Sequence, residues 1–175
     1  MRIEEINARN IRDINQANQP FTVIGRLWPM FADGKWTFTE ILYDEPYEKC
    51  YPNDEENYQE YIGHPEKTVL FCYADGQCVG QIRLRKNWNR YVFIEDIAVA
   101  RGSRGKGIGT SLVEKAIAWA KQKGLGGLML ETQDVNLPAC RFYAKLGFEI
   151  GAVDTMLYAN FASKDEKAIF WYLKF

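Results

Sequence analysis

The fold is decided by residues 95–110, which read EDIAVARGSRGKGIGT. A strand pattern runs into a loop rich in glycine and basic residues, and the loop leads directly into a helical pattern from Ile108. Such a junction aims backbone N–H groups and the positive end of a helix at one point, where they can bind phosphate. Arg104 and Lys106 add positive charge, and glycines let the backbone approach a ligand closely. The segment therefore predicts a phosphate-binding turn between a strand and a helix.

Strand and helix patterns continue on both sides of this segment. Apolar and β-branched runs bounded by turn residues are typical of strands, and apolar residues three and four positions apart are typical of helices. Strands that come first and then alternate with helices predict an α/β sandwich with a mixed sheet. The expected strands are 21–27, 36–43, 68–74, 77–86, 91–100, 128–131, 148–153 and 168–175, with a weak one over 154–161, and the expected helical segments are 10–17, 54–62, 108–123 and 136–146.

Composition and charge exclude several classes of protein. A chain of 175 residues is the length of one domain, 1–175, and its 22 basic against 23 acidic side chains do not suit a nucleic-acid binder. No apolar run reaches the roughly 18 residues that a membrane-spanning helix needs, and the acidic start is unlike a signal peptide. Four scattered cysteines and a single histidine, His64, offer neither a metal site nor a disulfide framework. We therefore expect a cytoplasmic protein with no metal and no nucleic-acid or membrane partner.

The glycine-rich loop does not match the two commonest phosphate-binding motifs. It has neither the Walker spacing nor the dinucleotide fingerprint, and the pattern that remains is R-x-x-G-x-G, formed by Arg104, Gly107 and Gly109. This pattern resembles the pyrophosphate loop of the Gcn5-related N-acetyltransferase (GNAT) superfamily, whose members bind acetyl-coenzyme A. A glycine-rich turn before a helix can also be merely structural.

A second motif downstream strengthens the resemblance. Residues 136–148 read NLPACRFYAKLGF and are similar to the N-x-x-A-x-x-F-Y-x-x-x-G-F element of the same superfamily. The resemblance covers a core of about 68–153 and implies the GNAT fold, in which a mostly antiparallel central sheet is flanked by helices on both faces. It implies acetyl-coenzyme A as acyl donor, held by Ile97, Ala98, Val99, Arg104, Gly105, Lys106, Gly107, Ile108, Gly109, Thr110, Asn136 and Tyr143.

The resemblance also implies catalytic roles for two side chains. Tyr143 matches the phenol that protonates the departing thiolate, and a tyrosine with a reference pKa of about 10 still carries its proton at neutral pH. Acids at the position of Glu95 often face the acceptor amine, so we expect Glu95 to be the base or the carboxylate that positions the amine. The alternation of strand side chains predicts that Glu95 and Asp96 point to opposite faces, with Asp96 paired to an arginine or capping a loop. Both acids can instead be structural ion pairs, and Tyr143 can instead pack under the sheet.

An acidic and aromatic segment, 43–61, offers a surface for a cationic substrate. Carboxylates of Asp44 and Glu45 beside the ring of Tyr43 match what a polycationic amine requires, namely opposite charge and cation–π contacts. The same acids can equally form an ordinary solvated face. The lead through Pro20 and the strands around Trp36 and Glu95 are similar to those of the streptothricin acetyltransferases, which acetylate the β-lysine arm of a cationic antibiotic.

Three functions follow from these patterns. The first is transfer of acetyl from acetyl-coenzyme A to an amine of streptothricin, directly in a ternary complex, because no residue resembles an activated nucleophile. The second keeps the chemistry but changes the acceptor to a polyamine or to a protein or peptide amine. The third is a coenzyme A-binding module without turnover. The aromatic tail 170–175 fits a homodimer interface and core packing equally well.

Overall fold

The computed structural model describes all residues, 1–175, and divides into two compact units that interleave along the chain. Unit 1 contains residues 1–21 and 50–128, and unit 2 contains residues 22–49 and 129–175. The single domain expected from chain length stays a prediction. The helices include none with the length and apolar character required to span a bilayer.

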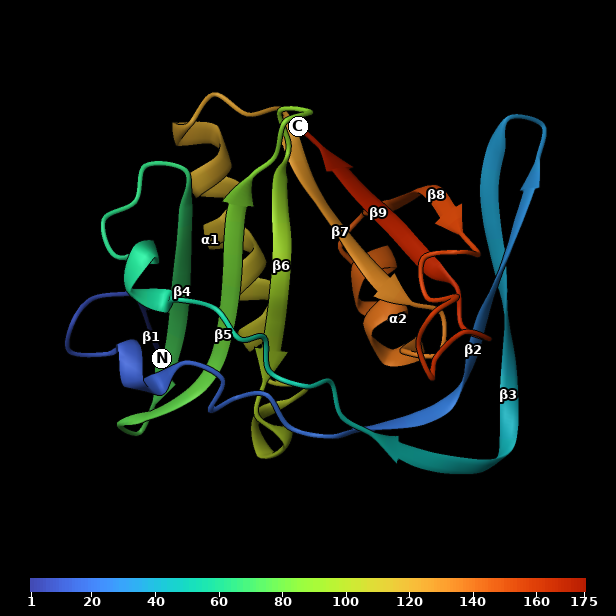
Figure 1. Cartoon of the computed structure of the whole chain (residues 1–175), viewed down its shortest axis with the longest axis horizontal. Helices are drawn as coiled ribbons and strands as arrows, with labels where there is room; N and C mark the ends of the chain where they lie inside the picture. The colour runs from blue at the N-terminus through green and yellow to red at the C-terminus, as the bar shows by residue number, and fades with distance from the viewer. The chain divides into compact units, whose positions relative to one another are not determined.

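Four antiparallel strands form the sheet of unit 1, in the order β1-β4-β5-β6 (Figure 1). A tight turn joins β4 to β5, with positive φ at Asp75 and Gly76 as an Asp-Gly pair predicts. The elements of this unit are β1 (Arg2–Glu5), η1 (Ile11–Asp13), η2 (Tyr58–Tyr61), β4 (Lys67–Ala74), β5 (Gln77–Lys86), β6 (Val92–Val99), η3 (Arg101–Ser103) and α1 (Ile108–Gln122), where η denotes a 3-10 helix.

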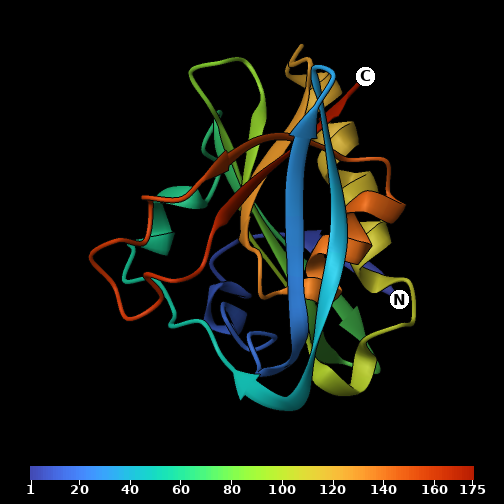
Figure 2. The same ribbon diagram turned by 90° about the vertical axis from the view of Figure 1, so that its right-hand side faces the viewer.

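Helical segments cover both faces of this sheet. Figure 2 shows α1 on one side of the strands and η2 on the other. The face of α1 that is turned to the sheet buries Leu112, Val113 and Ala116, at the three- and four-residue spacing that the sequence predicts. Because α1 covers β4, β5 and β6, it fixes the position of the glycine-rich loop that leads into it.

Helix α1 approaches β5 very closely at Gly80. A Cβ atom at this position would lie 2.8 Å from Cγ2 of Ile108 and 3.2 Å from Cδ1 of Leu112. Ile108 is the first residue of α1, so this contact seats the first turn of the helix against the sheet.

We expect Gly80→Ala to lower the free energy of unfolding by about 1–3 kcal/mol, because the added methyl group overpacks this contact. Gly126→Ala is the matched control: its Cβ meets nothing within 4 Å and its φ is not positive, so its effect should stay within about 0.5 kcal/mol. Urea unfolding of the two variants measures the difference. Equal stability would show that α1 can shift to admit the methyl group.

A β-bulge in β6 overturns the predicted alternation of its side chains. The register pairs Arg83 with Asp96 but Leu84 with Ile94, so Glu95 is the extra residue. Glu95 and Asp96 therefore point to the same face, where they bond Arg85 and Gln81 of β5. The prediction that they face opposite ways is wrong, because one inserted residue resets the two-residue period.

Unit 2 contains a long two-stranded ribbon and three further strands in the order β7-β9-β8. β8 and β9 are antiparallel, as are the strand pairs of unit 1. Together with the two α-helices, these antiparallel strands confirm the predicted fold class. The elements are β2 (Phe21–Ala32), β3 (Lys35–Lys49), β7 (Gly127–Gln133, which begins in unit 1), α2 (Leu137–Lys145), β8 (Glu149–Asp154) and β9 (Ala168–Lys174).

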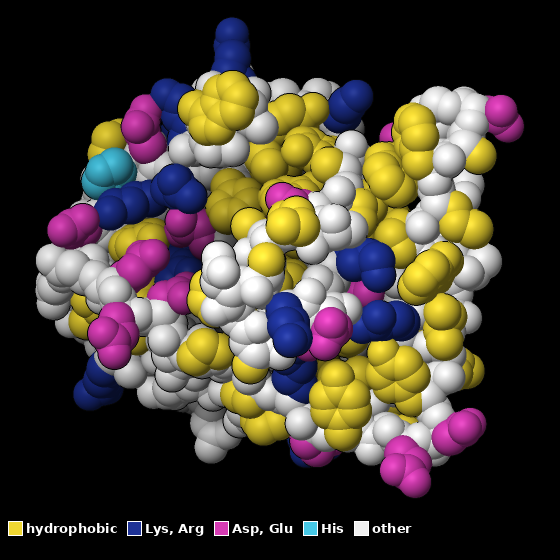
Figure 3. All heavy atoms as spheres, turned by 45° about the vertical axis from the view of Figure 1, so that its right-hand side comes forward, with side chains coloured by type: hydrophobic (Ala, Val, Ile, Leu, Met, Phe, Trp, Pro, Cys, Tyr) yellow, Lys and Arg dark blue, Asp and Glu magenta, His cyan; other side chains and the backbone are white.

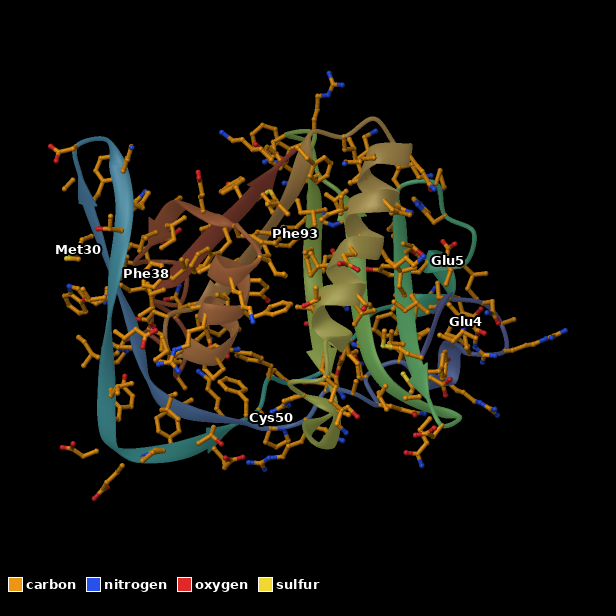
Figure 4. The ribbon with its side chains drawn as sticks, turned by 180° about the vertical axis from the view of Figure 1, so that it is seen from behind. Glu4, Glu5, Met30, Phe38, Cys50 and Phe93 are labelled. Carbon is orange, nitrogen blue, oxygen red and sulfur yellow. The ribbon has the colours of Figure 1, made fainter.

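The β2–β3 ribbon has one face packed and one face open. Figure 4 shows Phe38 pointing toward the rest of unit 2 and Met30 pointing away from it. The Phe38 ring meets Trp171 of β9 edge-on at 6.1 Å, and Trp171 is almost fully buried. This residue of the aromatic tail therefore belongs to the core. Hydrophobic side chains gather on the exposed ribbon (Figure 3). The exposed large hydrophobic residues of the ribbon are Trp28, Met30, Phe31, Ile41, Leu42 and Tyr47.

Four predicted elements differ from the structure. Residues 155–167 form turns and bends, so the weak strand expected over 154–161 is wrong beyond Asp154. The helical segments expected over 10–17 and 54–62 contain only the short 3-10 helices η1 and η2. The acidic run from Tyr43 continues as strand to Lys49, because ribbon pairing overrides its modest strand propensity.

Candidate active site

The glycine-rich loop of unit 1 forms an open cradle of backbone. It follows β6 through η3, and Gly105 and Gly107 both adopt left-handed φ angles, 76° and 81°, before α1 begins at Ile108. The first bond of the helix runs from the Ser111 amide to the Gly107 carbonyl at 3.0 Å. The amides that precede it have no carbonyl one turn earlier, and a Cβ at Gly105 or Gly107 would meet nothing within 4 Å. The cradle therefore has the donors and the space that a pyrophosphate requires.

The two basic side chains of the loop bond to backbone carbonyls. Arg104 donates to the carbonyls of Val99, Pro20 and Gln19, each at 2.9 Å. Lys106 Nζ donates to the Gly102 carbonyl at 2.8 Å. Arg104 thus joins the loop to the chain ahead of β2, and its charge acts on the cradle from a fixed position. Phosphate contact by either side chain stays a prediction.

A pocket of about 370 Å³ lies on the η2 face of unit 1. Acidic and basic side chains gather side by side on this part of the surface in Figure 3. All three of its acids are paired with cations: Glu60 accepts from Lys67 at 3.0 Å, Glu95 accepts from Arg85 at 2.7 Å, and Glu56 lies 3.9 Å from Nη1 of Arg83. The lining residues are Glu56, Asn57, Glu60, Tyr61, Lys67, Arg85 and Glu95.

Glu95 is the innermost acid of this pocket, with a side chain 11% exposed. Its Oε1 accepts from Arg85, and its Oε2 lies 2.9 Å from the Tyr61 hydroxyl and 3.6 Å from Nε of Arg83. The carboxylate therefore takes part in an ion-pair network, as one of the two interpretations of Glu95 expects, and it also lines a pocket. Its role as a base stays a prediction.

Arg83 is the buried centre of that network. Its side chain is 5% exposed and pairs with Asp54, while Nη1 donates to the Tyr58 hydroxyl at 3.2 Å. These bonds fasten the irregular segment before η2 over the sheet. The carboxylates around Arg83 raise its pKa, so the guanidinium stays charged despite its burial. Sequence reasoning missed Arg83, although a charged residue in a strand as apolar as β5 requires a partner.

Tyr61 and its partner Glu56 lie in the acidic and aromatic segment 43–61, but the sequence did not single out either residue. The Tyr61 ring is buried against Ile6, Val69 and Phe71, while its hydroxyl donates to Oε2 of Glu56 at 2.6 Å. Burial and the two adjacent carboxylates raise the pKa of Tyr61, so the phenol keeps its proton.

Asp96 does not take the arginine or loop-capping partner that the sequence predicts. Its carboxylate accepts from Nε2 of Gln81 at 2.6 Å, and the Gln81 side chain also bonds Asn15. Desolvation raises the pKa of Asp96. It is outside the pocket lining, so Glu95 is the better candidate for contact with an acceptor.

Unit 2 contains the remaining predicted site residues. Asn136 caps α2, because its side-chain oxygen accepts from the Ala139 amide at 3.3 Å. Tyr143 on α2 is buried against Phe148 and Trp171, with ring centroids 5.7 and 6.2 Å away. The packing interpretation of the Tyr143 ring is thus correct, and it leaves a role for the hydroxyl open.

The acidic ribbon residues are accessible. Tyr43 stacks on Tyr47 at 6.5 Å with an interplanar angle of 12°, and Asp44 and Glu45 are exposed between them on β3. Their part in substrate binding stays a prediction. The structure has no group of three or more His, Cys, Asp or Glu side chains placed to hold a metal ion.

Comparison with known proteins shows the family. The family model of the acetyltransferase (GNAT) family matches residues 34–148. Streptothricin acetyltransferase A of Bacillus subtilis is 52% identical over 166 residues, which cover 95% of each chain. A streptothricin acetyltransferase structure from Bacillus anthracis, in complex with acetyl coenzyme A, superposes with a TM-score of 0.90 at 36% identity and covers 99% of this chain and 96% of that chain. A nourseothricin acetyltransferase structure gives a TM-score of 0.83 at 29% identity, covering 99% and 97%. The resemblance seen in the sequence is confirmed, and the chain belongs to the acetyltransferase (GNAT) family of acetyl-coenzyme A-dependent N-acetyltransferases.

Proposed function

We propose that this enzyme acetylates an amino group of streptothricin, on its β-lysine arm, and so confers resistance to the antibiotic. The observation that carries the proposal is the acidic pocket beside β6, which ends at Glu95 two residues before the strand segment assigned to the donor. An ammonium group supplies donors and positive charge that match the carboxylates of this pocket. The similarity to Streptothricin acetyltransferase A supports the choice of acceptor.

The residues of the loop and of β6 bind the donor in this proposal. Backbone groups of Ile97, Ala98 and Val99 pair with the pantetheine arm, and Asn136 binds the same arm. The cradle from Arg104 to Thr110 holds the pyrophosphate through its amides. Acetyl-coenzyme A supplies the activated acetyl group.

Two side chains move protons. Glu95 holds the acceptor ammonium and takes its proton, which leaves a neutral nitrogen able to attack a thioester. Tyr143 protonates the thiolate that departs.

The cysteines support direct transfer over a covalent acetyl-enzyme. Burial raises the pKa of the Cys72 and Cys140 thiols, and it raises the pKa of Cys78 to about 11. Thiolate is the nucleophilic form, so none of these three is activated. All four cysteines are free, which fits the reducing, cytoplasmic location that we also propose.

The exposed acids of the ribbon steer the cationic substrate in this proposal. We expect the double variant Asp44→Asn/Glu45→Gln to raise KM for streptothricin by about 2–5-fold with kcat unchanged, and the effect to fade at high salt. Asp33→Asn at the ribbon tip is the matched control, because asparagine tolerates its φ of 52° and one charge is removed there. An unchanged KM in the double variant would assign Asp44 and Glu45 to an ordinary solvated face.

A thiol-release assay with acetyl-coenzyme A tests the function. Streptothricin, spermidine and a lysine-containing peptide are compared as acceptors. Saturable release with streptothricin alone supports the proposal. Release with spermidine or the peptide, but not with streptothricin, would keep the acetyltransferase and replace its substrate. Coenzyme A binding without release for any acceptor would favour a binding module.

A further inference from the structure

A chain of three oxygen atoms links the innermost carboxylate of the pocket to the edge of the pocket. The Tyr61 hydroxyl lies 2.9 Å from Oε2 of Glu95 and 2.6 Å from Oε2 of Glu56. One hydroxyl therefore bridges two carboxylates, whose oxygens are held within about 5.5 Å of each other. The Glu95 side chain is 11% exposed, and that of Glu56 is 38% exposed. The chain of oxygens thus runs from the interior toward solvent.

We propose that Tyr61 relays the acceptor's proton from Glu95 to Glu56, which releases it to solvent. This inference rests on the proposed function, in which Glu95 takes a proton from the acceptor ammonium. Acetylation of an ammonium group yields one net proton, and Glu95 must lose that proton before the next turnover. The structure offers Tyr61 as the exit.

The protons of the relay balance when they move in one concerted step. Protonated Glu95 donates its O–H proton to the Tyr61 oxygen, while Tyr61 donates its own O–H proton to Glu56. Tyr61 ends with one proton as it began, so no tyrosinate forms, and Glu95 is again a carboxylate. Glu56 then loses the proton to water, and rotation of the Tyr61 hydroxyl resets the chain.

The neighbouring charges leave this path open. Arg85 bonds Oε1 of Glu95, and the relay uses Oε2. Arg83 lies between the two carboxylates, 3.6 Å from Glu95 and 3.9 Å from Glu56, and it stabilises either one when it is ionised. The other charged groups at this face are already paired: Asp54 with Arg83, Asp96 with Gln81, and Lys67, which lies 4.7 Å from the Tyr61 ring centroid, with Glu60.

The ring of Tyr61 is fixed by the core, so the relay can be removed without moving it. Tyr61→Phe keeps the packing against Val69 and Phe71 and deletes only the hydroxyl. We expect kcat to fall about tenfold or more in dilute buffer at neutral pH, with KM for acetyl-coenzyme A unchanged. Added imidazole, a small base that carries protons from the pocket, should restore most of the lost kcat. Glu56→Gln, which still accepts from Tyr61 but cannot take its proton, should behave in the same way.

Tyr73→Phe is the matched control, because Tyr73 packs against the same core cluster and its hydroxyl also donates to a carboxylate, Asp13, at 2.7 Å, outside the pocket lining. Its kcat should equal that of the wild type. The double variant Tyr61→Phe/Glu56→Gln should be no slower than the slower single variant, because both act on one path.

The relay is overturned if Tyr61→Phe keeps full activity, or if its loss resists imidazole. If Tyr61→Phe does not fold, Glu56→Gln is tested in its place, because it blocks the exposed end of the same path. Full activity of Glu56→Gln, or a loss that imidazole does not restore, would then overturn the relay. The assay uses whichever acceptor turns over with the wild-type enzyme. Failure of streptothricin as acceptor therefore counts against the proposed function, and an unrescued loss on a working acceptor counts against the relay alone.

Discussion

Glu95→Gln will lower kcat about 100-fold or more, the range for loss of a general base, and will raise KM for the acceptor. Glutamine has the shape of glutamate, but it carries no charge to hold an ammonium and does not accept its proton. Coenzyme A affinity should stay the same, because the cradle lies beyond Val99 and does not contact this carboxylate. Steady-state kinetics and coenzyme A titration measure the two quantities separately.

Asp96→Asn is the control for this substitution, since it neutralises the next residue of the same strand outside the pocket lining. Its kcat should stay near that of the wild type, with the Gln81 contact kept by an amide oxygen. If Asp96→Asn loses turnover and Glu95→Gln does not, the base has been assigned to the wrong neighbour. If both variants keep wild-type turnover, the proton is taken by a water molecule and not by a carboxylate of β6.

Tyr143→Phe will lower kcat by about 10–100-fold at neutral pH, because the leaving thiolate loses its proton donor. Thermal stability should hardly change, since a phenyl ring preserves the contacts with Phe148 and Trp171. The difference in kcat between Tyr143→Phe and the wild type should become smaller as the pH rises past about 8.5, the reference pKa of a thiol. Above that pH the thiolate leaves without needing a proton. A pH profile of kcat for both proteins tests this.

Tyr158→Phe makes the same chemical change elsewhere in unit 2, where the hydroxyl donates to Glu131. It should leave kcat and its pH profile unchanged. A pH-independent loss in Tyr143→Phe would mean that the hydroxyl supports the fold and donates no proton.

Features set by short-range rules could be predicted from the sequence. Gly105 and Gly107 adopt the left-handed conformations that glycine favours, α1 begins at Ile108 as its apolar spacing predicts, and Asn136 stands at the cap of the next helix. These local motifs revealed the family resemblance, and the resemblance in turn implied the sheet topology.

The acceptor pocket could not be predicted in the same way. Its geometry depends on the bulge at Glu95, and nothing in an apolar strand marks which position is inserted. Its other members come from distant parts of the chain, since Glu56 and Tyr61 precede β4 and Arg83 lies on β5. Only tertiary packing brings them together, and a single sequence contains no signal for that pairing. The sequence shows Arg83 as a charge that requires a partner, but it does not show which residues pair with it.

The three carbonyl bonds of Arg104 bear on the thermodynamics of donor binding. They hold the cradle to Gln19 and Pro20, while Gly80 lets the first turn of α1 rest directly on the sheet. The loop is thus preorganised, and the entropy of ordering it is lost when the chain folds and not again when a ligand arrives. Binding of coenzyme A should therefore proceed with little induced fit, at a rate governed by encounter and charge.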